Sequence, residues 1–258
     1  MGYALVTGSS KGIGRAIALN LAGRGYDLLL VARSEDVLAE LALEITNTKK
    51  VQAHYLALDL SAKNAENQIL SWVESKGYEV SVLVNNAGYG LWGNFSDLTL
   101  EEQNNMMQLN MNFLVNLTYK LIPYLKKQPK SYILNVGSTA AYQAVPTLSL
   151  YAATKSFVVL FTRGLRHELA RTPISVSCLS PGGTKTGFIE RSRMHHLQKT
   201  SDKLSMEPEE VAEIGVKGML KGKMEIIPGF LNWFSVGLIR MLPKVLVEKA
   251  AGNLYKQK

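Results

Sequence analysis

The stretch YALVTGSSKGIG, residues 3–14, decides the fold of this chain. Its first residues are apolar or β-branched and predict a short buried strand, and residues 13–24 carry the pattern of a helix. The turn between these two elements contains three glycines, Gly8, Gly12 and Gly14. Such a turn lets the backbone approach a pyrophosphate, and the helix that follows offers free N–H groups and a positive dipole end. The spacing G-x-x-x-G-x-G differs from the general G-x-G-x-x-G fingerprint, so further residues must identify the ligand.

Beyond this turn, short aliphatic runs alternate with longer helical patterns. The predicted strands cover residues 4–7, 27–32, 51–58, 80–84, 132–136, 174–179 and 225–227. The predicted helices cover residues 13–24, 35–47, 63–76, 99–126, 150–171 and 208–221. Near-continuous apolar strands are typical of a parallel sheet that is buried on both faces. We therefore expect a Rossmann-like, doubly wound α/β fold, with a mostly parallel seven-stranded sheet, in a single domain that spans residues 1–258.

Composition limits the class of protein. The chain has 258 residues, of which 47% are hydrophobic and 19% are charged, enough apolar material for one sizeable core. The single cysteine, Cys178, excludes an intrachain disulfide framework, and its apolar surroundings predict a buried, inert thiol. The first residues lack the pattern of a signal peptide, so the expected location is cytoplasmic.

Positive charge is concentrated toward the carboxyl end. Of the formal net charge of +8, residues 185–258 contribute +5, with 13 basic against 8 acidic side chains. Such a region suits a membrane surface, an anionic substrate or a nucleic acid, although a solvated surface is the favoured interpretation. The chain has no nucleic-acid-binding motif and no zinc-ligand spacing, and His195-His196 lacks a partner at helical spacing. We therefore predict neither a nucleic-acid partner nor a bound metal.

The segment 226–258 is apolar and basic. Pro228, Arg240 and Pro243 interrupt it, which makes it a poor transmembrane helix. We expect it to fold over the mouth of a substrate site or to join a contact between subunits. A peripheral contact with a membrane is the less favoured alternative.

The end of the second predicted strand reads VARS, residues 31–34. In a fold of this kind, an acidic side chain there would bind the ribose 2′-hydroxyl of NAD. Arg33 occupies this region instead and can pair with a 2′-phosphate, and Lys11 in the glycine turn can add a second positive charge. The sequence therefore favours NADP(H) over NAD(H).

Tyr151 and Lys155 form the central chemical pattern. They are four residues apart on a predicted helix, so both side chains can point into one cleft. A free tyrosine has a pKa near ~10, and a nearby ammonium group lowers that pKa, which suits general acid–base chemistry. Ser138 follows the end of a strand thirteen residues earlier and could bind a substrate oxygen beside Tyr151. Its alternative interpretation is a helix cap.

In this order and at these spacings, the chain resembles the short-chain dehydrogenase/reductase family over roughly residues 3–228. The motifs that carry the resemblance are Thr7-Gly8-(x)3-Gly12-Ile13-Gly14, Asp59, Asn85-Asn86-Ala87-Gly88, Asn110, Ser138, Tyr151-(x)3-Lys155 and Pro181-Gly182. The resemblance implies Tyr151 as the general acid/base and Ser138 as the group that stabilises the substrate oxygen. It also implies that Lys155 binds the nicotinamide ribose, and that Asn110 perturbs its helix to hold a water of the proton relay.

The same resemblance implies a cofactor site. Asp59 would contact the adenine amino group, residues 86–88 would line the adenosine ribose, and residues near Pro181 would lie against the nicotinamide. The full expected set is Gly8, Ser10, Lys11, Gly12, Ile13, Gly14, Arg33, Asp59, Asn86, Ala87, Gly88, Tyr151, Lys155, Pro181, Gly182, Thr184 and Thr186. The family also implies a homodimer or homotetramer, for which the helices 99–126 and 150–171 could supply an interface.

These features predict hydride transfer between NADP(H) and a small-molecule carbonyl or alcohol. Substrate choice is expected to depend on a loop region, residues 187–205, and on the segment after Pro228. Several aromatic residues could line an apolar pocket and favour a hydrophobic substrate: Tyr89, Trp92, Phe95, Tyr142 and Phe188. Two alternatives stay open, a 3-oxoacyl-thioester reductase and a catalytically silent NADPH-binding regulatory or scaffold protein.

Overall fold

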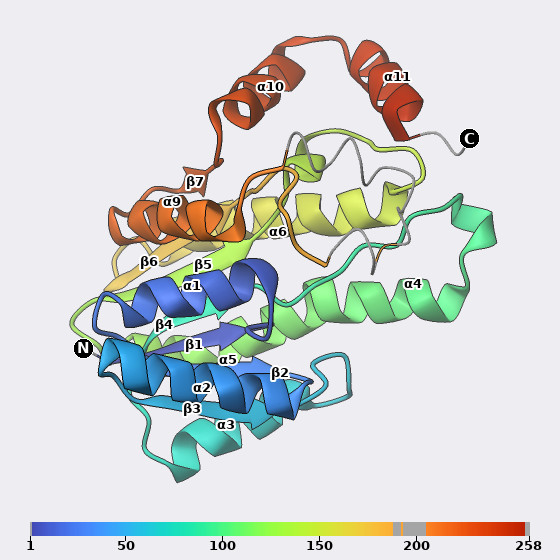
Figure 1. Ribbon diagram of the computed structural model, residues 1–258. Coiled ribbons are helices and arrows are strands. Elements are labelled where there is room, and N and C mark those ends of the chain that lie inside the picture. Colours follow the sequence, from blue (N-terminus) through green and yellow to red (C-terminus); the bar gives the residue numbers. More distant parts are fainter. Residues whose placement is uncertain (1, 188–191, 193–204, 256–258) are drawn as a thin grey trace.

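A computed structural model describes residues 2–187, 192 and 205–255 of the chain (Figure 1). Its centre is a parallel sheet of seven strands in the order β3-β2-β1-β4-β5-β6-β7. The strands are β1 (Tyr3–Thr7), β2 (Asp27–Ala32), β3 (Ala53–Ala57), β4 (Val80–Asn85), β5 (Ser131–Val136), β6 (Ile174–Leu179) and β7 (Glu225–Ile226). The predicted doubly wound sheet is confirmed, and every pair of neighbouring strands in it is parallel.

The strand order reverses between β1 and β4, which lie side by side at the centre of the sheet. Their register pairs Val6 with Val84, and the next pair of strands aligns Asn85 with Asn135. Ligands of open α/β sheets bind outside the carboxyl ends of the strands at such a reversal. The fold therefore places the glycine turn after β1 and the motifs that follow β4 and β5 at one edge of the sheet.

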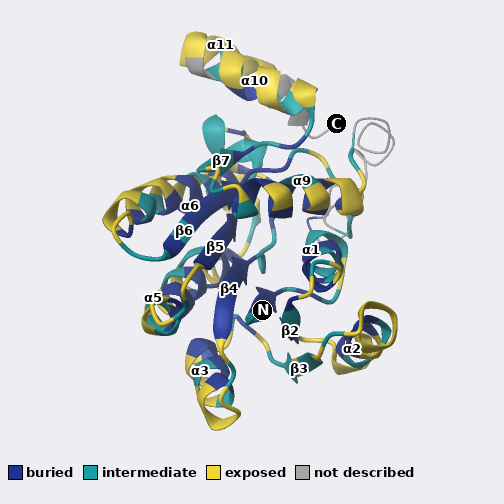
Figure 2. Cartoon of the chain, turned by 90° about the vertical axis from the view of Figure 1, so that its left-hand side faces the viewer, coloured by how far each residue is buried: buried dark blue, intermediate teal, exposed yellow. Residues whose placement is uncertain are grey.

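Helices cover both faces of the sheet (Figures 1 and 2). They are α1 (Gly12–Ala22), α2 (Glu35–Lys49), α3 (Ala65–Ser75), α4 (Leu100–Met107), α5 (Leu114–Leu125), α6 (Ser149–Glu168) and α9 (Pro208–Leu220). Successive strand residues point to opposite faces, so Val6 packs with α1, α2 and α9 while Leu5 packs with α3, α5 and α6. Two buried cores hold the sheet between the helical layers.

The predicted single helix over residues 99–126 is wrong in its middle. The structure divides it into α4, a π-helical segment η2 (Gln108–Phe113) and α5. A π-helix accommodates an extra residue and turns side chains away from their regular positions. Asn110 lies in this segment. Its side chain is 1% exposed and forms hydrogen bonds with Tyr89 and Thr154, outside its own helix.

The segment after β7 forms two helices that the sequence pattern did not predict, α10 (Phe230–Met241) and α11 (Lys244–Tyr255). Both lie at one end of the molecule beyond β7 and are coloured largely as exposed in Figure 2. Of the described helices, none is long and apolar enough to cross a membrane. Two short helical elements complete the chain as described, η1 (Phe95–Asp97) and η3 (Thr139–Tyr142).

Candidate active site

The glycine turn after β1 has a geometry that only glycine satisfies easily. Gly8 and Gly12 have φ angles of 67° and 57°, in the region that L side chains rarely adopt. A Cβ atom at Gly14 would lie 2.2 Å from the carbonyl oxygen of Gly8, so α1 begins directly against the turn. The backbone is thus open to a ligand where the first N–H groups of α1 lack partners within the helix. This cradle fits the pyrophosphate of a dinucleotide.

Two residues brace the turn, Asn86 directly after β4 and Thr7 at the end of β1. The carboxamide of Asn86 donates hydrogen bonds to the carbonyl oxygens of Thr7 and Gly8, over 3.0 and 3.1 Å. The hydroxyl of Thr7 donates to the carbonyl oxygen of Val84 and accepts from the N–H groups of Asn86 and Ala87. The structure thus gives Asn86 contacts with the turn itself. The bracing by Thr7 was missed, because its partners are 77–80 residues away in sequence.

Two predicted residues follow the ends of strands, Arg33 after β2 and Asp59 after β3, and Lys11 lies in the glycine turn after β1. Arg33 and Lys11 are both exposed, and Arg33 forms no ion pair with any residue that the structure describes. Asp59 follows β3 and accepts hydrogen bonds from the backbone N–H and the hydroxyl of Ser61. Glu35 and Asp36 follow Arg33 in the first turn of α2, so the end of β2 is followed by exposed side chains of both charges.

Tyr151 and Lys155 lie on α6, and both side chains are buried, with exposures of 8% and 6%. Lys155 Nζ is 6.0 Å from the centroid of the Tyr151 ring and donates a hydrogen bond of 2.8 Å to the carbonyl oxygen of Val136. Burial lowers the pKa of Lys155 to about 8, and Cys178 acts in the opposite direction. The hydrogen bond to β5 therefore holds the ammonium group near the tyrosine ring and away from solvent.

Asn110 connects the π-helical segment to this pair. Its amide nitrogen donates to the carbonyl oxygen of Tyr89 at 2.9 Å and to the hydroxyl of Thr154 at 3.1 Å, and its oxygen accepts from the Tyr89 N–H at 3.1 Å. A Cβ atom at Gly88 would lie 2.9 Å from Asn110 Oδ1 and 3.4 Å from Lys155 Nζ. The structure therefore brings Gly88, Asn110 and Lys155 into direct proximity. The role of Thr154 was missed, because it lies inside the Tyr-x-x-x-Lys spacing without a signal of its own.

Ser138 is partly buried and lies two residues after the end of β5, as the N-cap of η3. Its hydroxyl oxygen accepts the N–H of Ala140 at 3.1 Å, so this serine also caps the short helix η3. Ser156 on α6 donates to the carbonyl oxygen of Ala141 at 2.6 Å and fastens η3 to the helix that carries Tyr151. Both interpretations of Ser138 are therefore compatible with the structure: the cap uses an acceptor lone pair and leaves the hydroxyl hydrogen available.

The loop after β6 contains the remaining predicted residues. The carbonyl oxygen of Pro181 accepts the N–H of Thr139, and the Thr184 hydroxyl donates to the carbonyl oxygen of Gly182. The Thr186 side chain lies over the glycine turn, 2.8 Å from a Cβ atom built at Gly12. Asn232 of α10 was not foreseen: its side chain touches Gly182, where a Cβ atom would lie 2.4 Å from Asn232 Oδ1.

A buried polar ladder lies beneath the site. Asn85 donates to the hydroxyl of Thr118 at 2.9 Å and to Asn135 Oδ1 at 2.8 Å, and Asn135 donates to the hydroxyl of Thr162 at 2.9 Å. All four side chains are buried. These bonds align the ends of β4 and β5 with α5 and α6, and thereby position the residues that follow both strands.

Tyr142 belongs to a second polar cluster rather than to an apolar pocket wall. Its hydroxyl is 2.5 Å from Glu225 Oε1 and 3.0 Å from the Ser180 hydroxyl. Burial, followed by the hydrogen bond with Glu225, raises the pKa of Tyr142. Cys178 lies nearby and is 1% exposed, which confirms the predicted burial of this cysteine, and burial raises the pKa of its thiol.

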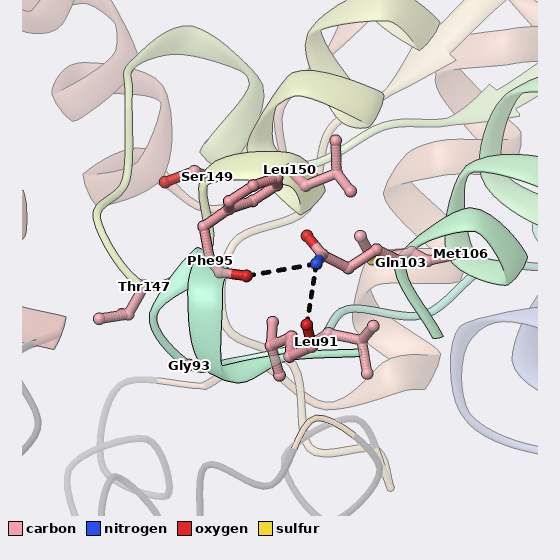
Figure 3. A pocket seen from close by; sticks show the side chains of 9 residues that line it. Leu91, Gly93, Phe95, Gln103, Met106, Thr147, Ser149 and Leu150 are labelled. Atoms are coloured by element: carbon pink, nitrogen blue, oxygen red, sulfur yellow. Dashed lines mark hydrogen bonds between the residues drawn. The ribbon is translucent and has the colours of Figure 1, made fainter. Parts of the chain in front are cut away.

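Figure 3 shows a pocket between the loop after β4, α4 and the start of α6. Its lining consists of Leu91, Gly93, Phe95, Leu98, Gln103, Met106, Thr147, Ser149 and Leu150. Gln103 donates to the carbonyl oxygens of Phe95 and Leu98. The pocket adjoins the amino-terminal end of α6, where Ser149 and Leu150 directly precede Tyr151. Phe188, the pair His195-His196 and most of the loop region 187–205 lie outside the described residues.

Within the described residues no group of three or more potential metal ligands occurs.

The chain is similar to several known proteins. The family model described as short chain dehydrogenase matches residues 2–196. An uncharacterized oxidoreductase of Staphylococcus epidermidis is 33% identical over 187 residues, which cover 72% of this chain and 80% of that protein.

Two further proteins extend the match toward the carboxyl end. A very-long-chain 3-oxoacyl-CoA reductase of Anas platyrhynchos is 32% identical over 242 residues, covering 91% of this chain and 75% of that protein. The structure of a short-chain dehydrogenase from Sphingobium yanoikuyae in complex with NADPH is 28% identical, with a TM-score of 0.83 and coverage of 93% and 94% of the two chains. The family match, which spans most of the chain, and the buried Tyr151–Lys155 pair lead to one conclusion: this chain belongs to the short-chain dehydrogenase family of oxidoreductases.

Proposed function

We propose that the protein is an NADP(H)-dependent oxidoreductase that interconverts a hydrophobic ketone or aldehyde and the corresponding alcohol. The observation that carries this proposal is the pair Tyr151 and Lys155, buried together on α6 at the carboxyl ends of β4 and β5. Chance copies of this spacing on exposed helices would leave the lysine solvated. Here the ammonium group is desolvated and hydrogen-bonded to Val136, which suits a group that acts on a neighbouring phenol.

Each of the three polar side chains has a distinct task in this proposal. Tyr151 gives a proton to the substrate oxygen during reduction, or takes one during oxidation. The Ser138 hydroxyl donates a hydrogen bond to the same oxygen, since its cap with Ala140 uses only an acceptor lone pair. The positive charge of Lys155 favours the ionised form of Tyr151 and holds the helix against β5.

The cofactor part of the proposal rests on the glycine turn and the end of β2. When bound, the nicotinamide cofactor supplies or accepts the hydride. The turn around Gly8 would hold its pyrophosphate, and Arg33 with Lys11 would face the 2′-phosphate of NADP(H). Asn110, through the π-helical segment, would hold a water in the path by which Tyr151 is reprotonated. The loop from Pro181 would hold the carboxamide.

A second candidate substrate is a 3-oxoacyl thioester. The similarity to a very-long-chain 3-oxoacyl-CoA reductase over 91% of this chain favours it, and the basic carboxyl-terminal region suits an anionic carrier. The alternative of a catalytically silent NADPH-binding protein has less support, because such a protein has no chemical need for Ser138, Tyr151 and Lys155 together.

We also propose a homodimer or homotetramer, with a cytoplasmic location. Exposed apolar side chains on α5 and α6 support the assembly, among them Tyr119 and Leu160, which are 77% and 66% exposed. Such side chains on long neighbouring helices can form an interface between subunits.

The decisive experiment is a screen of NADPH oxidation across aldehydes, ketones, quinones and 3-oxoacyl thioesters. Turnover of bulky ketones or aldehydes is the expected result. Turnover of acetoacetyl-CoA without activity on simple ketones would select the thioester substrate instead. NADPH binding without turnover of any carbonyl class would refute the enzymatic proposal and favour the silent protein.

A further inference from the structure

The helices α10 and α11 expose an unusual amount of apolar surface. Nine large apolar side chains between residues 230 and 246 are exposed in the structure as described. We call them the C-terminal apolar face: Phe230, Leu231, Trp233, Phe234, Leu238, Met241, Leu242, Val245 and Leu246. Phe230 is 73% and Met241 86% exposed. An apolar surface of this extent on one helical pair marks a site of interaction rather than ordinary surface scatter.

The opposite side of the helical pair is already packed. Val236 is 1% exposed and Ala251 is 5% exposed, and a Cβ atom at Gly252 would lie 3.3 Å from Pro146. Asn232 donates to the carbonyl oxygen of Pro228 at 2.8 Å and touches Gly182. The inward side is therefore anchored to the body of the molecule near η3 and the loop after β6. The C-terminal apolar face points away from that contact and needs another partner.

The charge of this region indicates the chemistry of the partner. Residues 229–258 contain five basic side chains (Arg240, Lys244, Lys249, Lys256 and Lys258) against one acidic side chain, Glu248. Lys244 and Lys249 are exposed on α11 beside the apolar residues. Aromatic and aliphatic residues flanked by lysines are the composition of helices that lie in the interface of an anionic membrane.

We propose that the C-terminal apolar face binds the surface of an anionic lipid bilayer, with α10 and α11 lying in the plane of the interface. Neither helix is long and apolar enough to span the bilayer. A symmetric contact with a second copy would bring two net-positive faces together, which the charge disfavours. Anionic headgroups complement the lysines, and acyl chains accept Trp233 and its neighbours.

This placement has a consequence for access to the cleft. The helical pair packs on η3 and on Gly182, beside the residues that follow β5 and β6. A substrate dissolved in the bilayer would meet the protein at the end where these loops lie. The binding itself is independent of the proposed reaction, and its test needs no turnover.

The first test measures insertion of Trp233 directly. The variant Trp72→Phe, Trp92→Phe retains Trp233 as its single tryptophan. We expect its fluorescence to shift to shorter wavelength and to be quenched by acyl-chain-brominated lipids in vesicles of phosphatidylcholine and phosphatidylglycerol. Fluorescence that stays unchanged at saturating vesicles would overturn the proposal.

The second test separates lipid binding from other uses of the face. In vesicle flotation, Trp233→Ser with Phe234→Ser should lower the bound fraction by about tenfold or more, because two aromatic side chains no longer enter the interface. Lys244→Gln with Lys249→Gln should weaken binding by about tenfold and reduce its sensitivity to salt.

Matched controls lie on α2 and at its C-cap residue, Lys50. Leu43 is 63% exposed on that helix, so Leu43→Ser removes apolar surface elsewhere, and Lys49→Gln with Lys50→Gln removes the same charge. Both should bind vesicles like the wild type. Equal losses in the controls would overturn the assignment. A second result would also overturn it: no vesicle binding by the wild type, together with an oligomer in analytical ultracentrifugation that dissociates in the Trp233→Ser, Phe234→Ser variant. The C-terminal apolar face would then contact a second copy of the chain.

Discussion

The ammonium nitrogen of Lys155 lies 2.8 Å from the carbonyl oxygen of Val136, to which it donates a hydrogen bond. This contact ties the helix that carries Tyr151 to the last residue of β5. Ser138 follows that strand two residues later. One buried lysine thus connects the helix that carries Tyr151 to the strand that precedes Ser138.

The pH dependence of stability tests the burial of Lys155. Its pKa is about 8 in the folded protein, against an ordinary value of 10.5. Between these values the unfolded chain binds more protons, so the free energy of unfolding rises with pH by up to roughly 3 kcal/mol across this window. Denaturation at pH 7 to 10 should show the stability of the wild type rising with pH relative to that of Lys155→Met, which lacks the titrating group. A difference that is constant with pH would contradict the buried, desolvated lysine.

Tyr151→Phe should abolish turnover while NADPH binding stays largely intact. General acid–base catalysis contributes on the order of 10²–10⁴ in rate, so kcat should fall by at least about a hundredfold. Steady-state kinetics and titration of NADPH fluorescence measure the two effects. Tyr119→Phe, on the exposed part of α5, is the matched control and should retain full activity. Substantial activity of Tyr151→Phe would remove this residue from the mechanism.

Arg33→Asp should weaken NADPH selectively. A charge-assisted contact to a 2′-phosphate contributes about 1.5–3 kcal/mol, so the ratio of the NADPH to NADH dissociation constants should rise by about tenfold or more. Calorimetric titration with both cofactors gives this ratio. Arg171→Asp makes the same charge change in the turn after α6 and should leave the ratio unchanged. The role of Arg33 would be refuted by an unchanged ratio.

Gly14→Ala should disrupt the glycine turn. Its Cβ atom would lie 2.2 Å from the carbonyl oxygen of Gly8, so backbone must shift and cofactor affinity must fall. We expect a loss of stability of about 1–3 kcal/mol by overpacking. Gly164→Ala is the control, because nothing lies within 4 Å of its Cβ position in α6, and it should be neutral or stabilising. Similar melting temperatures and affinities for both variants would contradict the close packing.

Asn110→Ala should affect both stability and chemistry. It removes the partner of the Tyr89 backbone and of the Thr154 hydroxyl, at a cost of about 1–3 kcal/mol. If Asn110 also holds the relay water, kcat should fall more than KM rises. Asn116→Ala, on the exposed side of α5, should change neither. A stability loss with normal kcat would limit Asn110 to a structural role.

The sequence by itself determined the sheet and the elements of the site that local patterns encode. The strand runs, the glycine turn and the Tyr151–Lys155 spacing each follow from neighbouring residues, so hydrophobic period and turn chemistry are sufficient to predict them. Even the extra helices α10 and α11 have an apolar character that composition reveals. Their boundaries escaped prediction because nearly every residue of α10 is apolar or small, which leaves little periodicity.

Only the tertiary structure decided which side chains meet across the chain. The π-helical segment forms around Asn110, whose partners Tyr89 and Thr154 lie 21 and 44 residues away. Tyr142 turns to Glu225, 83 residues away, because β7 completes the sheet beside β6. The outward side of α10 was set by packing of Val236 against the body of the molecule. Such contacts depend on closing long loops, and no local pattern in the sequence specifies them.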